Sequence, residues 1–547
     1  MSARWRIALA LGVALLAILW FGTLGVRPLY RADEARYAEI AREMAVTGDW
    51  LTPRLNGFKY FEKPPLQYWA TAVAFKLFGT TEWTARLWAA LTGFTGVLAA
   101  AFLAYRLKGP RAAFVTAAIL ASSALYIGLA QFNTLDMGVS LFLTLAMFGL
   151  VLAQRDDASP VAERGWMLVA WAGAALAVLS KGLIGIVLPA IATFAYIAFE
   201  RDWRLLKRLH IVSGGAVFLA IAAPWFIAAS MANAEFARFF FIHEHFERFL
   251  TEVHQRYQPV WFFGGVLAWG LVPWTLTVLV SFRKAWREAP AQRFRPLRFL
   301  LVWTVIVFAF FSVSSSKLPS YILPIFPALA VMAGTAYEGT DRRWFVIQAV
   351  LVATIAFAAA AVAPWLLARE ASPQLPADLL AGYAPWANTA AIALGLGAVI
   401  AAGLAWGGRS LAAAGALACG GFLFVQIALA GHGRLGVVYS AYDSVAKIKS
   451  RVSGDAPFYS VDMFDHSLPF YLGRTVTLVA NPDELAASVR WEPERFVPTM
   501  AEFEYRWRDA PRAYAMMSPR DYAALAQAGL PMTVIARDPR RVFVEKP

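Results

Sequence analysis

Long apolar segments separated by short polar ones recur along most of the chain. Each runs for about 18 residues or more, enough for a helix to cross the ~30 Å hydrocarbon core of a bilayer. The first extends from about Ile7 to Val26, and no small-residue cleavage site follows it, so we interpret it as a retained first helix. The pattern predicts about 13 membrane-spanning helices in all. The further segments begin near Leu87, Ala112, Leu135, Gly165, Leu183, Ile211, Val260, Leu300, Ser320, Trp344, Ala387 and Leu411.

The basic residues between these segments favour alternate sides of the membrane. If the N-terminus is cytoplasmic, the inner segments from Arg4 to Arg409 hold 20 Lys and Arg, against six in the outer loops after the first one. Cytoplasmic loops carry an excess of Lys and Arg. The bias therefore predicts a cytoplasmic N-terminus, and an odd number of helices then places the C-terminus on the outer face.

From about Arg434 the hydropathy falls and the pattern changes. The segments "APFYSVDMF", "TVTLVA" and "RVFVEKP" are typical of strands, and "SPRDYAALAQAGL" has the serine start and spacing of a capped helix. We expect residues 434–547 to form a soluble α/β periplasmic domain. Residues 1–433 are expected to form an all-α polytopic membrane domain, with a long first periplasmic loop at 27–86.

Composition supports a membrane protein and excludes other classes. The chain is 59% hydrophobic and only 16% charged, where soluble domains average roughly 45–50% and 25%. A formal charge of +14 suggests nucleic acid at first, but no basic stripe alternates with stacking aromatics, which argues against strand binding. The single cysteine, Cys419, excludes an internal disulfide and a Cys/His zinc cluster, and we expect it to be a buried small hydrophobe.

The first outer loop is long enough to have a purpose of its own. Its segment "YRADEARYAEIAREMAVTGDW" predicts a helix from about Ala32 to Val46 with Asp33 as cap or first-turn acid. On this helix Asp33, Arg36, Tyr37 and Ile40 share one face. A carboxylate, a guanidinium and a phenol are thus offered together, although an amphipathic helix lying in the membrane interface would show the same pattern.

A second block, "TPRLNGFKYFEKPPLQYW", follows in the same loop. Asn56-Gly57 predicts a tight turn. Lys63 precedes two prolines, which hold it in an extended segment. A plain turn followed by an interfacial helix remains an alternative interpretation of this block.

These two blocks resemble the first periplasmic loop of the polyprenyl-phosphate-dependent glycosyltransferases of the GT-C type, a superfamily that includes the protein O-mannosyltransferase-like enzymes. Within it the sequence is most similar to the bacterial lipid A 4-amino-4-deoxy-L-arabinose (aminoarabinose) transferases. The similarity extends over the whole chain, with an acid at Asp136, an outer loop near His243, and "DHSLPFYLGRTVTLV" in the tail. It implies a GT-C fold and a transferase that uses a lipid-linked sugar.

The resemblance also implies roles for residues of the first loop. Transfer from a polyprenyl phosphate needs cations and hydrogen-bond donors for an anionic leaving group. Arg36, Tyr37, Tyr60 and Lys63 are accordingly expected to bind the donor phosphate.

Two acids are candidate catalytic residues. Asp33 matches the functional acid of the family. It would orient the acceptor, bind the amine of the sugar or stabilise developing positive charge if the acceptor is an already ionised phosphate, and would remove a proton from a protein hydroxyl. Asp136 starts a spanning helix at the outer face, where its alternative is an ordinary helix N-cap.

Other outer-face residues are further candidates. Arg248, Lys317 and Tyr321 are expected to contact the acceptor or a second phosphate, with a snorkelling interfacial lysine as the alternative for Lys317. Glu62 and His243 are candidate ligands of a divalent metal such as zinc, against an ordinary interfacial helix at "FFFIHEHFERF". No other cofactor is expected.

The leading hypothesis is an inverting glycosyltransferase of the bacterial inner membrane. It would move aminoarabinose from undecaprenyl phosphate to a lipid A phosphate, which implies resistance to polymyxin and other cationic peptides. The expected partners are the lipid-linked sugar, lipid A and membrane lipids, and we expect a monomer. The alternatives are another sugar such as mannose, a protein hydroxyl acceptor, or a membrane transporter; transport pathways, however, usually place ionisable residues near the midplane.

Overall fold

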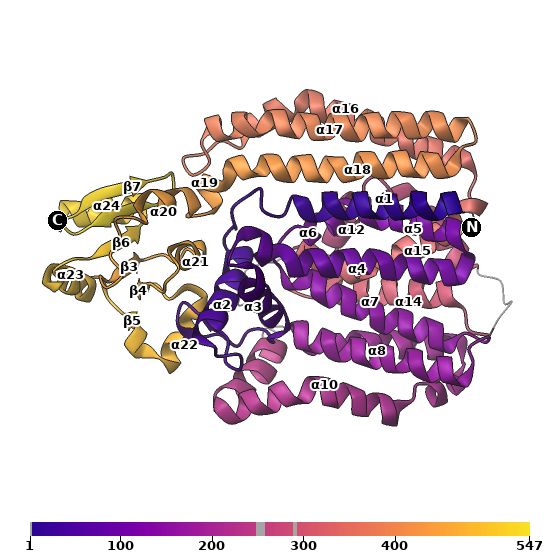
Figure 1. The fold of residues 1–547 in the computed structure, drawn as a ribbon, viewed down its shortest axis with the longest axis horizontal. Helices are drawn as coiled ribbons and strands as arrows, with labels where there is room; N and C mark the ends of the chain where they lie inside the picture. Colours follow the sequence, from indigo (N-terminus) through magenta and orange to yellow (C-terminus); the bar gives the residue numbers. More distant parts are fainter. Residues whose placement is uncertain (1–2, 248–257, 288–292) are drawn as a thin grey trace.

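The computed structural model describes residues 3–247, 258–287 and 293–547. Most of the chain forms a bundle of roughly parallel helices, and the C-terminal residues form a smaller part built on a β-sheet at one end of it (Figure 1). We call this end the sheet end. The N-terminus lies at the opposite end of the bundle and the C-terminus beyond the sheet end, as an odd number of spans requires.

Among the described residues, nine helical stretches are long and apolar enough to cross a membrane. They are α4 (Glu82–Lys108), α7 (Leu135–Gln154), α8 (Pro160–Lys181), α10 (Ile211–Ala232), α14 (Pro296–Val313), the stretch Pro319–Gly339 that contains η3 (Pro319–Ile325) and α15 (Phe326–Ala336), α16 (Arg342–Arg369), α17 (Ala377–Trp406), and α18 (Ser410–His432) with its extension to Tyr439.

Two bent helix pairs and two shorter apolar helices complete the bundle in the described part of the chain. The bent pairs are α5 (Pro110–Ser122) with α6 (Ala124–Ala130), at 67°, and α12 (Phe262–Gly270) with α13 (Thr275–Trp286), at 110°. The shorter helices are α1 (Ala3–Gly22) and α9 (Ile184–Glu200). Each apolar segment of the sequence corresponds to one of these elements, so the predicted polytopic all-α bundle is confirmed.

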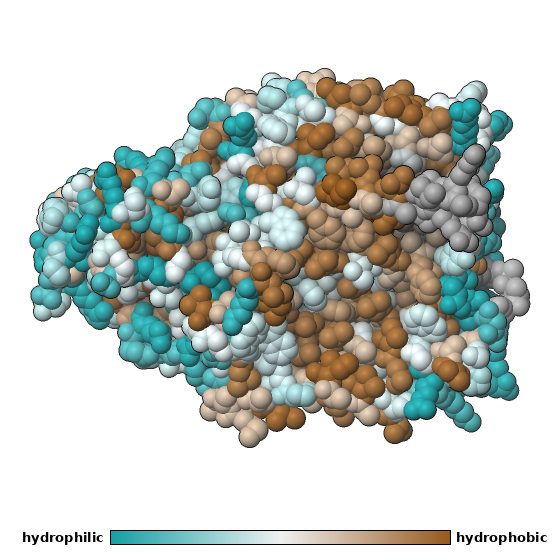
Figure 2. Space-filling view, viewed as in Figure 1, coloured by the Kyte–Doolittle hydropathy of each residue, from teal (hydrophilic) through white to brown (hydrophobic). Residues whose placement is uncertain are grey.

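The surface shows the zones that a membrane protein needs. In Figure 2 a broad hydrophobic zone covers the helices between hydrophilic zones at the sheet end and at the opposite end. Cys419 corrects one expectation, because it is exposed on α18 and not buried. In a bilayer, apolar side chains face lipid as readily as they face other helices, so an apolar segment does not reveal which of its faces is buried.

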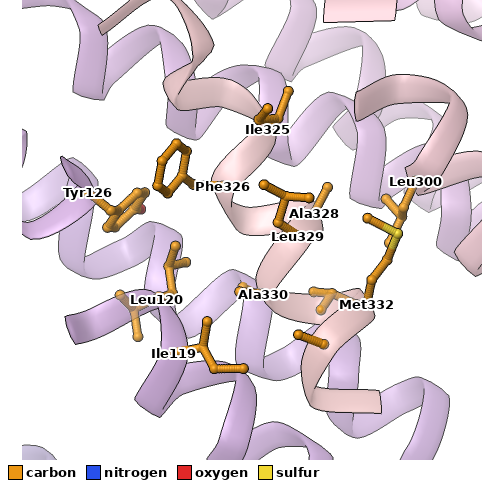
Figure 3. Packing of buried hydrophobic residues seen from close by; sticks show 14 of the residues in the cluster. Ile119, Leu120, Tyr126, Leu300, Ile325, Phe326, Ala328, Leu329, Ala330 and Met332 are labelled. Carbon is orange, nitrogen blue, oxygen red and sulfur yellow. The ribbon is translucent and has the colours of Figure 1, made fainter. Parts of the chain in front are cut away.

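The centre of the bundle is occupied by α15, all of whose residues are buried. Figure 3 shows Phe326 beside Tyr126 of α6, and Met332 beside Leu300 of α14. The loops of the sheet end are thus connected to a closely packed helical core.

The first loop folds as its sequence predicts. It forms α2 (Asp33–Thr47), a hairpin of β1 (Arg54–Leu55) and β2 (Phe58–Lys59), and α3 (Leu66–Phe78). Asn56 and Gly57 adopt φ of 53° and 82°, the positive values that a two-residue hairpin turn requires. Asp33 lies in the first turn of α2 but caps no backbone group.

The C-terminal part is built on a six-stranded sheet with the order β5-β4-β3-β6-β8-β7. Strands β3 to β6 run parallel, and β8 pairs antiparallel with β6 and β7. The strands are β3 (Phe458–Val461), β4 (Thr477–Val479), β5 (Phe496–Val497), β6 (Tyr514–Met517), β7 (Thr533–Arg537) and β8 (Val542–Glu545). The helices that precede and connect the strands are α19 (Gly436–Tyr439), α20 (Tyr442–Ile448), α21 (Ser467–Leu472), α22 (Ala486–Trp491), α23 (Met500–Asp509) and α24 (Pro519–Gln527).

The sequence predicts three of these strands, β3, β4 and β8, and the helix α24 correctly. Ser518 caps α24 by accepting a hydrogen bond from the backbone of Asp521. The short strands β5, β6 and β7 were not predicted.

Candidate active site

Side chains from three parts of the chain meet at the sheet end of the bundle. Figure 1 shows α2 and α3 of the first loop between the spanning helices and the C-terminal part. The first turn of α7, which carries Asp136, packs against the same region: Leu135 joins the hydrophobic cluster that holds α2, α3 and the sheet. Candidate residues of the first loop and of the start of α7 therefore lie in one region of the structure.

Arg36 is held between two carboxylates. Its Nη1 lies 3.0 Å from Oδ1 of Asp33, one turn earlier on α2, and its Nη2 lies 2.5 Å from Oε2 of Glu484 in the C-terminal part. The other oxygen of Glu484 lies 2.8 Å from Nε2 of His466. Burial would raise the pKa of the Glu484 carboxyl, but the charges of Arg36 and His466 outweigh it and lower that pKa. The site thus contains an ionised carboxylate contributed by the C-terminal part.

Glu484 is a residue that sequence reasoning missed. In the sequence it lies in "NPDEL", which resembles an ordinary turn, and nothing local links it to the first loop. Asp33 is the exposed member of this cluster, with 46% of its side chain accessible, while Arg36 has only 10% accessible.

Three phenols lie around the same place. Tyr37, Tyr60 and Tyr68 are buried, and the rings of Tyr37 and Tyr68 have their centroids 5.9 Å apart. Within the described residues, the hydroxyls of Tyr60 and Tyr68 have no hydrogen-bond partner. Burial, and then the charge of Glu62, raises the pKa of Tyr60, so its hydroxyl keeps its proton and can donate it. A buried hydroxyl without a partner costs roughly 1–3 kcal/mol, which a bound ligand would recover.

Lys63 follows β2 and lies opposite the segment after α10. Its Nζ lies 2.7 Å from the carbonyl oxygen of Glu62 and 2.9 Å from Oε2 of Glu244. Burial, and then the charge of Glu244, raises the pKa of Glu62. Lys63, the residue expected to bind the donor phosphate, is therefore already paired with the carboxylate of Glu244. A bound phosphate would have to replace that partner.

Asp136 forms a second charged cluster. It makes a short ion pair with Lys181, the last residue of α8, and Lys181 Nζ lies 4.8 Å from the ring centroid of Tyr321. The N-cap of α7 is Thr134, so the alternative interpretation of Asp136 as a helix cap is wrong. The structure brings Asp136 and Tyr321 together through Lys181, the basic residue at the end of α8.

The remaining candidates lie farther along the chain. Lys317 is buried, and its Nζ donates to the carbonyl oxygen of Gln258 at 2.8 Å, so the snorkelling alternative does not describe it. His243 lies in the π-helix Arg238–Glu247 with its ring stacked on Phe239 at 5.1 Å. Arg248 lies outside the described residues. In the described ranges no three His, Cys, Asp or Glu side chains gather as metal ligands, so a metal held by Glu62 and His243 stays a prediction.

Glu34, beside Asp33, is the buried centre of a charged network. Its carboxylate accepts from Arg86 Nε at 2.7 Å, from Arg27 Nη1 at 3.1 Å, and from the backbone N–H of Asn133 at 3.1 Å. Burial would raise the pKa of Glu34, but the charges of Arg86 and Arg27 lower it to about 2. Glu34 therefore ties the start of α2 to the turn before α7, and so fixes Asp33 relative to Asp136.

The C-terminal part holds the β1–β2 hairpin directly. Asn56 and Val476 exchange two hydrogen bonds of 2.8 and 2.7 Å, and Arg54 lies 2.9 Å from Glu492. The candidate site is therefore built jointly by the first loop, the spanning helices and the C-terminal part.

Two family models match the chain. Residues 5–240 match the model described as dolichyl-phosphate-mannose-protein mannosyltransferase, and residues 444–546 match the model described as aminoarabinose transferase C-terminal domain. The mannosyltransferase model covers Asp33 and Arg36 of α2, and the aminoarabinose transferase model covers Glu484.

Similar sequences are named undecaprenyl phosphate-alpha-4-amino-4-deoxy-L-arabinose arabinosyl transferases. One from Pseudomonas fluorescens is 34% identical over 338 residues, covering 61% of this chain and 56% of the relative. One from Sodalis glossinidius is 34% identical over 388 residues, covering 68% and 66%. The matched regions thus span less than two thirds of these curated relatives.

Solved structures match over nearly the whole chain. ArnT from Cupriavidus metallidurans in the apo state has a TM-score of 0.93 and 38% identity, covering 99% of this chain and 98% of that one. The same protein bound to undecaprenyl phosphate also has a TM-score of 0.93, with 39% identity and coverage of 100% and 98%. An oligosaccharyltransferase from Archaeoglobus fulgidus, with a TM-score of 0.54 and 14% identity, shares the fold alone.

The architecture is that of a polytopic membrane glycosyltransferase of the GT-C superfamily. Within that superfamily, the chain belongs to the aminoarabinose transferase family.

Proposed function

We propose that this protein transfers 4-amino-4-deoxy-L-arabinose from undecaprenyl phosphate to a phosphate group of lipid A. The observation that carries the proposal is the position of Arg36 between Asp33 and Glu484. The C-terminal part, which matches the aminoarabinose model, adds an ionised carboxylate to a first loop that matches the mannosyltransferase model. Aminoarabinose differs from mannose in carrying a cationic amine. With Glu484 holding Arg36, Asp33 is the exposed carboxylate that can meet this amine.

The reaction we propose is a single displacement at the anomeric carbon. A bond forms between that carbon and an oxygen of the acceptor phosphate, while the bond to the undecaprenyl phosphate oxygen breaks and its electron pair leaves with the phosphate. An acceptor phosphate is largely ionised near neutral pH, because the second pKa of such groups lies near 6. No proton then needs to be removed, so Asp33 would act by charge and orientation.

The cations of the site would stabilise the leaving group. Charge accumulates on the donor phosphate as the bond breaks, and preorganised donors there lower the barrier. Lys63 is the cation we assign to this phosphate. The hydroxyls of Tyr60 and Tyr68, which have no hydrogen-bond partner in the described part of the chain, are assigned as further donors. Arg36 has both of its terminal nitrogens on carboxylates, so we assign it first to holding Asp33 in place and second to the phosphate.

We place the reaction at the periplasmic face of a bacterial inner membrane. The loops at the end opposite the sheet are rich in Lys and Arg, as cytoplasmic loops are. Addition of an amine to lipid A phosphate would weaken the attraction of cationic peptides, so polymyxin resistance is the proposed phenotype.

Mass spectrometry of lipid A tests the proposal. Cells that express the protein should add the mass of one aminopentose to a lipid A phosphate, and cells that express Asp33→Asn should not. Unmodified lipid A in both strains, with the protein present in the membrane, would reject the proposed substrates. Appearance of a hexose on periplasmic proteins would favour the protein-acceptor alternative, which the mannosyltransferase model keeps open.

A further inference from the structure

Arg31 and Arg540 lie near each other where the first loop touches the C-terminal part. Arg31 lies between the end of α1 and the start of α2, and its backbone N–H donates to the carbonyl oxygen of Tyr439 at 2.9 Å. Arg541 Nη2 donates to the carbonyl oxygens of Val437 and Ser440, both at 2.7 Å, which places the neighbouring Arg540 at the same short segment. That segment forms the end of the candidate membrane span Ser410–Tyr439, so the arginines lie where bilayer meets solvent.

The acids near these arginines are already engaged. Asp465 and Asp538 pair with Arg541 at 2.5 and 2.9 Å. Asp465 also accepts from both the backbone and the hydroxyl of Ser467, and Asp538 accepts from the hydroxyl of Ser444. The carboxylates of Asp465 and Asp538 are therefore both paired with Arg541.

Arg31 and Arg540 both lie within reach of the charge of Asp465, but that carboxylate is already paired with Arg541. Among the described residues, neither side chain forms a hydrogen bond or an ion pair, and both are only partly exposed. Burial, and then the positive charges of Arg31 and Arg541, lowers the pKa of Arg540, so the guanidinium groups lie close enough to repel. Like charges held together at a partly buried position are unfavourable unless an anion joins them.

We propose that Arg31 and Arg540 bind the phosphate group of the acceptor lipid. Paired guanidinium groups match the geometry and charge of a phosphate. Arg31 is separated from Asp33 only by Ala32, so a phosphate held by Arg31 would lie beside the start of α2, which carries Asp33. The assignment rests on the proposed function, because it identifies the anion as the acceptor of that reaction.

Kinetics of the full-length protein in lipid nanodiscs test the assignment. The double variant Arg31→Gln/Arg540→Gln should raise the KM for diphosphorylated lipid A by roughly tenfold or more, since it removes charge-assisted hydrogen bonds. The KM for the undecaprenyl-phosphate sugar should not change. The variant Arg31→Lys/Arg540→Lys should recover part of the loss, because it restores charge without the planar fork. Arg537→Gln, an exposed arginine on β7, is the matched control and should behave as wild type.

A binding measurement separates the sources of the anion and does not depend on turnover. Wild-type protein should retain diphosphorylated lipid A in preference to dephosphorylated lipid A and to phosphatidylglycerol, and the double Gln variant should lose that preference. Equal retention of phosphatidylglycerol would make this a general headgroup site and overturn the assignment. An unchanged acceptor KM in a folded double Gln variant would overturn it as well. If the wild-type protein transfers no sugar but keeps the phosphate preference, the proposed function fails and the anion site stands.

Discussion

The carboxylate of Glu484 lies 2.5 Å from the guanidinium of Arg36, although one belongs to the C-terminal part and the other to the first loop. The contact is buried, and Arg36 in turn contacts Asp33. Through it, the part of the chain that matches the aminoarabinose transferase model takes part in the candidate site and is not merely attached to it.

Removal of the Glu484 charge tests this joint construction. We expect Glu484→Gln to lower kcat/KM for the aminoarabinose donor by about 10–100-fold, since a hydrogen bond to a charged group contributes roughly 1.5–3 kcal/mol. The measurement is transfer to lipid A by purified protein. Glu494→Gln is the control, because 70% of the Glu494 side chain is exposed and it lies outside the cluster. Wild-type kinetics in Glu484→Gln would remove Glu484 from the site.

Asp33 should be essential for transfer but not for folding. Among Asp33, Arg36 and Glu484, Asp33 has the most exposed side chain. Asp33→Asn therefore removes charge where substrate is expected, and Arg36 keeps its contact with Glu484. We expect transfer to fall by at least about 100-fold, a barrier increase of ~2.7 kcal/mol, with an unchanged thermal melting temperature in detergent. Asp378→Asn, an exposed acid in the first turn of α17, provides the comparison. Retained transfer in Asp33→Asn would reject the role assigned to Asp33.

Lys63 should act on the donor. Its ammonium is the cation we place on the donor phosphate, so Lys63→Ala should raise the KM for the undecaprenyl-phosphate sugar more than the KM for lipid A. The expected increase is about tenfold or more, in line with the loss of one charge-assisted hydrogen bond. Lys76→Ala changes an exposed lysine in the last turn of α3 and should leave both constants unchanged. Equal effects on both substrates would contradict a donor-specific role.

Glu34 should make stability depend on acid pH. Its folded pKa of about 2 lies below the ordinary value of 4.5, so its charge stabilises the folded protein above pH 4.5, and this contribution is lost as the pH falls through 4.5 towards 2. The shift corresponds to roughly 3 kcal/mol at neutral pH. Glu34→Gln should therefore lower the melting temperature at pH 7, and the difference from wild type should shrink below pH 4.5.

A matched comparison makes the Glu34 result specific. Glu82→Gln changes the partly exposed first-turn acid of α4 at the same end of the bundle and should not alter the pH profile. A Glu34→Gln protein with wild-type stability at pH 7 would show that the ion pairs with Arg27 and Arg86 contribute no net stability.

Much of the architecture was available from the sequence because it depends on local patterns. Hydrophobic runs indicated the spans, the Asn56-Gly57 pair indicated the hairpin turn, and the spacing of Asp33, Arg36 and Tyr37 placed them on one helical face. Strands β3, β4 and β8 could be found from their alternating or apolar residues, while β5 and β7 are short or largely exposed and carry weaker patterns.

The sequence by itself thus determined which apolar segments form helices, their order and the residues that the first loop offers. Only the tertiary structure decided which side chains pair, as Arg36 does with Glu484 and Asp136 with Lys181. It also brought the charges of Arg31 and Arg540 near each other. It also turned Cys419 outward. The physical reason is that periodicity and turn chemistry act between neighbours in the chain, whereas pairing of charges and burial of a given face depend on segments that are brought together only when the bundle, the loop and the sheet pack.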